Sequence, residues 1–154
     1  MRHSRKIIPA LIAVAFFAIH PAYGAESRKA TVQEVRGEVL ARTGGSDWQA
    51  AQAGLVLEEQ DEVRTGADSE AVILLDDDKV GKVELREKSY FRVNTLKEDT
   101  ASGRRVTLLD LAEGKLRVYA KKRKDGSKFE VRTPTAIAGV RGTVFDVSVD
   151  EKKK

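Results

Sequence analysis

LRVYAKKRKDGSKFEV, residues 116–131, is the stretch that decides the fold class. Apolar and polar residues alternate over residues 116–120 and again over 129–131, and this period of two is typical of β-strands with one buried face. Asp125-Gly126 lies between the two runs, and an Asp-Gly pair readily adopts the positive φ angles of a tight turn. The stretch therefore predicts two β-strands joined as a hairpin.

The same pattern continues along the chain in both directions. Short runs rich in valine, leucine and isoleucine recur, and Ala71–Leu75 is an unbroken apolar run of strand length. Turn-forming residues separate the runs, as at Gly44-Gly45, Thr65-Gly66, Asp76-Asp77-Asp78 and Glu113-Gly114. Turns spaced about 8–12 residues apart predict an all-β domain, and the pattern fits a sandwich, a barrel or a short solenoid equally well.

Residues 1–24 have the three parts of a cleavable secretory signal peptide. The first six residues carry three basic side chains, residues 7–19 form an apolar run, and Ala22-Tyr23-Gly24 supplies small residues at the cleavage site. The apolar run is shorter than the roughly 20 residues of a membrane-spanning helix, so we expect no transmembrane anchor. We expect cleavage before Ala25, a flexible leader over 25–30, and an exported protein, either periplasmic or, as the alternative, extracellular.

Removal of the signal segment changes the composition of the chain. The segment carries three of the 28 basic residues, none of the 24 acidic residues and both histidines, His3 and His20. The mature chain then holds 25 basic and 24 acidic residues, so its net charge gives no reason to expect nucleic-acid binding. It also lacks histidine and cysteine, which excludes Ser-His-Asp and Cys-His catalysis and zinc sites built on these residues. We expect no enzyme activity, no cofactor and no metal.

One basic cluster lies at the tip of the predicted hairpin. It consists of Lys121, Lys122, Arg123, Lys124 and Lys128. One interpretation is a solvated loop whose lysines discourage the pairing of strand edges. The other is a contact site for an acidic partner protein, an anionic lipid head group or a cell-wall polymer. The basic tail, residues 151–154, is predicted to be a solubilising end.

The remaining polar clusters and the aromatic residues give weaker expectations. Asp76, Asp77 and Asp78 lack the alternating ligands of a calcium loop, so we expect a solvated turn there. Paired carboxylates can hydrolyse glycosides, but their separation in space decides this. Trp48 follows a glycine-containing loop, and we expect it in the core, with a surface anchor as the alternative.

Several segments resemble the FecR domain. Residues 60–71, QDEVRTGADSEA, are similar to its opening signature of an acidic residue, a valine, Thr-Gly and a serine before a strand. Residues 111–116, LAEGKL, resemble its Leu-x-x-Gly-x-Leu element, and residues 129–136 and 140–147 are similar to its closing signature. We interpret the signature positions as fold determinants: Val63, Thr65, Gly66, Ser69, Gly114, Thr133, Pro134, Arg141, Gly142, Thr143 and Phe145.

The resemblance implies an all-β, short β-solenoid-like domain of many short strands over residues 31–150, with a β-sandwich as the alternative. Members of this family look like anti-sigma regulators, with a cytoplasmic segment, one membrane span and then this domain in the periplasm. There the domain meets the signalling domain of an outer-membrane metal-siderophore receptor. The sequence shows neither the cytoplasmic segment nor the span, so we expect only the role in protein interaction to carry over.

Three functions follow from these observations. The first is an exported, non-enzymatic, signalling-related binding module that contacts another envelope protein through an exposed strand edge or a charged loop. The second is a protein that binds peptidoglycan or anionic glycan through residues 121–128. The third is a hydrolase that uses carboxylates alone, which requires a cleft with two facing carboxylates.

Overall fold

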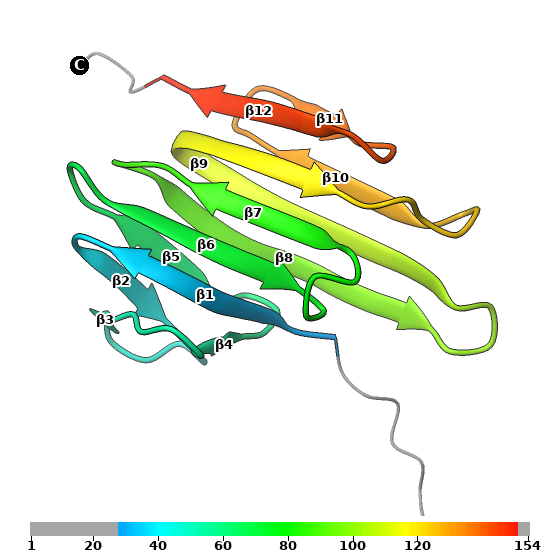
Figure 1. The fold of residues 1–154 in the computed structure, drawn as a ribbon, viewed down its shortest axis with the longest axis horizontal. Helices are drawn as coiled ribbons and strands as arrows, with labels where there is room; N and C mark the ends of the chain where they lie inside the picture. The colour runs from blue at the N-terminus through cyan, green and yellow to red at the C-terminus, as the bar shows by residue number, and fades with distance from the viewer. Residues whose placement is uncertain (1–27, 151–154) are drawn as a thin grey trace, which may run out of the picture.

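The computed structural model describes residues 28–150 (Figure 1). Strands make up 58 % of these residues and none of them is helical, which confirms the all-β prediction. The predicted signal peptide and the basic tail lie outside the described residues. The strands are β1 (Ala30–Arg36), β2 (Val39–Arg42), β3 (Gln49–Ala50), β4 (Val56–Leu57), β5 (Glu62–Thr65), β6 (Glu70–Leu75), β7 (Gly81–Leu85), β8 (Tyr90–Asp99), β9 (Arg104–Ala120), β10 (Lys128–Arg132), β11 (Ile137–Gly139) and β12 (Val144–Val149).

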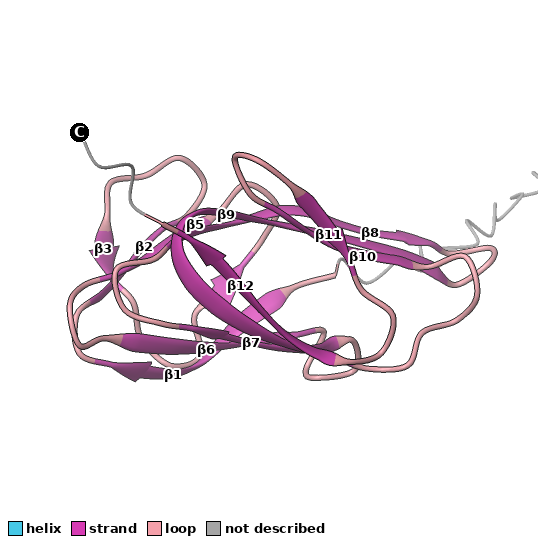
Figure 2. Cartoon of the chain, turned by 90° about the horizontal axis from the view of Figure 1, so that it is seen from above, coloured by secondary structure: helices cyan, strands magenta, loops and turns pink. Residues whose placement is uncertain are grey.

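The strands form one sheet that curls over a core, and its two halves face each other (Figure 2). Strands β1, β4, β6, β7 and β12 lie in one half, and β2, β3, β5, β8, β10 and β11 lie in the other. Each strand buries alternate side chains against the core, as Ala71, Ile73 and Leu75 of β6 do. The period of two read from the sequence therefore marks the inner face of the curl.

Strand β9 belongs to both halves. Its first part pairs with β8, and its second part, from Gly114 onward, pairs with β7 and β12. The strand bends at Gly114, which has a φ of 86°, a conformation that favours glycine. The turn that Glu113-Gly114 predicts is thus a bend within one continuous strand.

The hairpin predicted for residues 116–131 is wrong, although both strands and the turn exist. Gly126 has a φ of 81°, and the Ser127 N–H donates to the carbonyl of Lys124 at 3.1 Å. Strand β10 pairs in parallel with the first part of β9, with Lys128 opposite Val106. Because β9 bends back on itself, residues 121–127 cross from one half of the sheet to the other instead of closing a hairpin.

The chain passes between the two halves at corners that stack along one end, on the left in Figure 1. The Glu38 N–H donates to Ser69 Oγ at 2.9 Å, and the Lys115 N–H donates to Ser89 Oγ at 3.0 Å. Each serine therefore ties its own corner to the neighbouring one. This winding is the property that the structure shares with a solenoid, but its neighbouring strands run mostly antiparallel.

Candidate functional site

The sheet has an open side where strands β11 and β12 each have one unpaired edge, along the top of Figure 1. Strand β12 pairs only with β9, and β11 pairs only with β10. The outer backbone of each strand is therefore free to pair with another chain within the described structure. We name this region, β11 together with β12, the open side.

Apolar side chains are concentrated at the open side. Ile137 and Val144 are 63 % and 58 % exposed, and Phe145, Val147 and Val149 pack against the core while remaining partly exposed. Ile137 and Val144 are apolar but do not lie in the core. Both residues lie on the last strands of the sheet, which no further described strand covers.

The residues of the closing family signature lie along the open side. Thr133 and Pro134 start a tight turn between β10 and β11, closed by the Thr133 N–H on the carbonyl of Ala136 at 2.8 Å. Arg141 and Thr143 are exposed in the loop before β12, and in the described structure Arg141 has no hydrogen bond. Phe145 is half-buried on β12.

The opening part of the signature is structural. Val63 is fully buried. The Thr65 hydroxyl donates to the carbonyl of Arg86 at 2.6 Å and accepts from the Ser89 N–H at 2.9 Å. Thr65, like Ser69 and Gly114, therefore lies at a corner of the sheet and stabilises it.

The basic cluster divides into residues that are already engaged and residues that are not. Lys121 Nζ pairs with Asp78 at 2.5 Å, and Lys124 Nζ donates to the carbonyl of Ser102 at 2.6 Å. These two lysines therefore hold the loop against neighbouring turns. Only part of the positive charge predicted for this loop is available to a partner.

Arg123, Lys122 and Lys128 have different surroundings. Arg123 turns inward and donates to the carbonyl of Val140. Burial, and secondarily the charge of Arg141, lower the pKa of Arg123. Lys122 and Lys128 are exposed and form no ion pair within residues 28–150.

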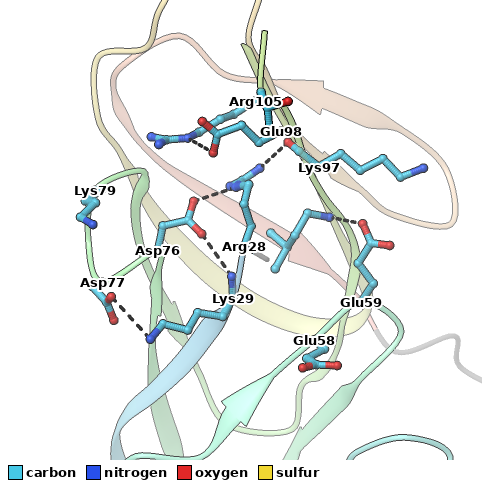
Figure 3. A pocket seen from close by; sticks show the side chains of 12 residues that line it. Arg28, Lys29, Glu58, Glu59, Asp76, Asp77, Lys79, Lys97, Glu98 and Arg105 are labelled. Atoms are coloured by element: carbon cyan, nitrogen blue, oxygen red, sulfur yellow. Dashed lines mark hydrogen bonds and ion pairs between the residues drawn. The ribbon is translucent and has the colours of Figure 1, made fainter. Parts of the chain in front are cut away.

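A charged pocket of about 670 Å³ is shown in Figure 3. It lies at the end of the sheet opposite the stacked corners, where β6 ends and β9 begins. Arg28 lies at its base with a side chain only 3 % exposed, and its Nε donates to Asp76 at 2.7 Å. Its other nitrogens donate to the carbonyls of Lys97 and Val106 and to the Thr107 hydroxyl. Arg28 therefore fastens one half of the sheet to the other.

This anchoring corrects the predicted leader. Residues 25–30 were expected to be flexible, but Arg28 is bound on several sides, the Lys29 N–H donates to Asp76, and Ala30 begins β1. Residues 25–27 lie outside the described part. The domain thus begins at least as early as Arg28.

Four of the five carboxylates of the pocket are held by hydrogen bonds and ion pairs. Asp76 pairs with Arg28, Asp77 with Lys29 at 3.6 Å, and Glu98 with Arg105 at 3.0 Å. Glu59 accepts the Leu96 N–H at 2.7 Å. These contacts close the edge of the sheet.

A row of alternating charges crosses the outer face of the second half. Its members lie opposite one another in register on β2, β5, β8, β9 and β10: Arg42, Glu62, Arg92, Asp110 and Arg132.

The Glu62 side chain is 3 % exposed and accepts from Arg42, Arg92 and the Tyr90 hydroxyl. Burial alone would raise the pKa of Glu62, but these hydrogen bonds outweigh it and lower the pKa to about 2. This row could be recognised in the sequence, because each of its five residues occupies an outward position in a strand whose apolar and polar residues alternate.

Trp48 lies beside this row and not in the core. The Arg64 guanidinium is 4.4 Å from the Trp48 ring centre and 4.6 Å from that of Tyr90. Such cation–π contacts stabilise exposed sites only modestly. The expectation that Trp48 is a core residue is therefore wrong, and its half-buried ring packs on the outer face.

Glu62 makes the stability of the domain sensitive to acid. Because its pKa is lower in the folded chain than its ordinary value of 4.5, its contribution is complete above about pH 4.5 and is lost as the pH falls towards 2. We expect this loss to be about 3 kcal/mol. Urea unfolding across this pH range should show the loss in the wild type and a flatter profile in Glu62→Gln. The Asp47 side chain is exposed and makes no hydrogen bond or ion pair within residues 28–150, so Asp47→Asn should keep the wild-type slope between pH 4.5 and 2. A Glu62→Gln profile as steep as the wild type would contradict the assignment.

The fold places the protein in the class of all-β domains that consist of a single curled sheet with unpaired edges. A family model described as FecR protein matches residues 61–154, well over half of the chain, and the chain therefore belongs to the FecR family. FecR domains are signalling-related domains of envelope proteins and act as regulators rather than enzymes. Searches of curated proteins and of solved structures found no match. Across residues 28–150 no helix has the length and apolar character needed to cross a membrane.

Proposed function

We propose that this protein is an exported, non-enzymatic FecR-like domain that binds another protein of the cell envelope, in the periplasm, through its open side. Membership of the FecR family supports a signalling-related role, and the signal-like sequence of residues 1–24 supports export. The observation that carries the proposal is the unpaired edge of β12 with apolar side chains beside it.

The chemistry of this edge defines the kind of partner. A strand edge offers main-chain N–H and C=O groups that an added strand can satisfy, and neighbouring side chains then give specificity. Val144 and Ile137 are exposed, and Phe145 and Val147 are partly exposed. The partner is therefore an extended segment in which apolar and polar residues alternate, so that its apolar side chains extend the core past β12.

A pair of lysine substitutions tests this proposal. Ile137→Lys with Val144→Lys adds charge to the apolar surface without changing buried positions, so the fold should persist while partner binding falls at least about tenfold. A photo-crosslinker placed at Ser148 should capture one defined envelope protein from wild type and lose it in the double variant.

Val56→Lys provides the matched control. Val56 is 43 % exposed on β4, the edge strand at the other end of the sheet order, so its substitution should leave the capture unchanged. Equal loss of capture in Val56→Lys and in the double variant would mean that added charge acts non-specifically. Full capture by the double variant would exclude the open side as the contact.

A further inference from the structure

A small, partly open cavity of about 70 Å³ lies beneath the basic cluster, between the 121–127 loop and strand β9. A water molecule occupies about 30 Å³ of liquid volume, so the cavity has room for a tetrahedral oxyanion. Six of the residues that line it are basic and none is acidic: Lys79, Arg105, Lys122, Arg123, Lys124 and Lys128. We name it the basic cavity.

The polar side chains around the basic cavity are positioned to donate hydrogen bonds. Arg123 Nη1 is buried and has no hydrogen-bond partner among the described residues. Thr107 Oγ1 already accepts from Arg28 at 2.8 Å, and Ser127 Oγ already accepts from the Arg105 N–H at 3.1 Å. Each hydroxyl therefore still has its own proton to donate, and both residues line the cavity.

The charge around the cavity is only partly balanced. Arg105 is paired with Glu98, whereas Lys79, Lys122 and Lys128 form no ion pair in the described part of the chain. A buried cationic nitrogen without a partner is costly, and an anion that accepts its hydrogen bond removes that cost. The lowered pKa of Arg123, caused first by burial and then by Arg141, agrees with this imbalance.

We propose that the basic cavity binds a phosphate group, with Arg123 Nη1 and the hydroxyls of Thr107 and Ser127 as hydrogen-bond donors and with Lys122 and Lys128 closing over it. The small volume favours a free phosphate ion or the terminal phosphate of a larger envelope molecule, since a phosphodiester has chain on both sides. This site is separate from the open side and does not depend on the proposed protein contact.

Binding of inorganic phosphate to the full mature chain, measured by calorimetry at constant ionic strength, tests the proposal. Exposed charges contribute up to about fivefold each, so Lys122→Gln with Lys128→Gln should weaken phosphate binding by more than about twofold and up to about 25-fold. Lys88→Gln with Lys115→Gln removes the same charge from exposed residues that do not line the cavity, and it should leave the affinity within about twofold. Arg123→Met should abolish binding, and the two lysine pairs keep the test decisive if that variant does not fold.

Vesicles distinguish the two sources of the phosphate group. Phosphatidylcholine vesicles with phosphatidic acid as the only anionic lipid present a terminal phosphate, whereas vesicles with phosphatidylglycerol present a diester. Cosedimentation with the phosphatidic acid vesicles supports a membrane-borne phosphate source if it is lost in the Lys122→Gln, Lys128→Gln variant. Binding of inorganic phosphate in the calorimeter supports a free phosphate ion as the source. Equal weakening in both lysine pairs, or no binding of either probe, would overturn the proposal. Loss of phosphate binding would leave the Ser148 cross-link unaffected, so the two proposals fail separately.

Discussion

Replacing Arg28 by methionine is expected to lower the free energy of unfolding by about 3–5 kcal/mol, because removal of one partner leaves a buried charge uncompensated. Asp76 loses its ion pair, and the carbonyls of Lys97 and Val106 lose their donor. The Thr107 hydroxyl loses its contact as well. Since these groups come from both halves of the sheet, the variant should also loosen the junction between the halves.

Urea unfolding at neutral pH measures this effect, and Arg36→Met is its control. Arg36 is on the same terminal segment, but its side chain is 81 % exposed and its nearest carboxylate, on Glu70, is 3.9 Å away. Adding Asp76→Asn to Arg28→Met should recover part of the lost stability by removing the unpaired charge. The anchoring role of Arg28 is refuted if its substitution costs no more than that of Arg36.

Gly114→Ala is expected to destabilise the domain by a similar amount, about 3–5 kcal/mol, because backbone strain and overpacking add. Gly114 has a φ of 86°, which side-chain-bearing residues rarely adopt. A Cβ atom there would also lie 2.5 Å from the carbonyl oxygen of Lys88 and 2.5 Å from Ser89 Cα. Backbone atoms cannot move aside cheaply, so the bend of β9 and the corner at Ser89 would both be displaced.

Gly45→Ala separates strain from crowding. Gly45 has a φ of 74°, but no atom lies within 4 Å of a Cβ built there. Its substitution should therefore cost only the conformational part, about 1–2 kcal/mol. Comparison of the two variants by thermal and urea unfolding gives the steric contribution, and equal losses would show that Gly114 is not crowded.

The positions of the strands could be predicted from the sequence, but their neighbours could not. Alternation identifies which face of residues 116–120 and 129–131 is buried, and any strand with a matching face can pair with them. The Asp125-Gly126 turn forms as expected. The information that was missing is the bend at Gly114, which returns Ala120 to the end of the sheet where β9 begins.

The candidate sites show the same division. The basic character of residues 121–128 is visible in the sequence, but the neutralisation of Lys121 by Asp78 and the inward turn of Arg123 depend on the crossing of this loop. Arg28 could not be found at all, because its side-chain partners lie 48 to 79 positions away along the chain. No local pattern carries information about contacts of that kind.

Strand β9 has a consequence for how the domain folds and unfolds. Because its first part completes one half of the sheet and its second part completes the other, neither half can lose β9 without the other losing a central strand. The domain is therefore a single cooperative unit, and partial opening is confined to the outermost strands. Its core also depends on pairings between distant segments, such as β1 with β6, so closure of the sheet waits until residues 104–120 are in place, and folding is slow compared with that of helical domains of similar size.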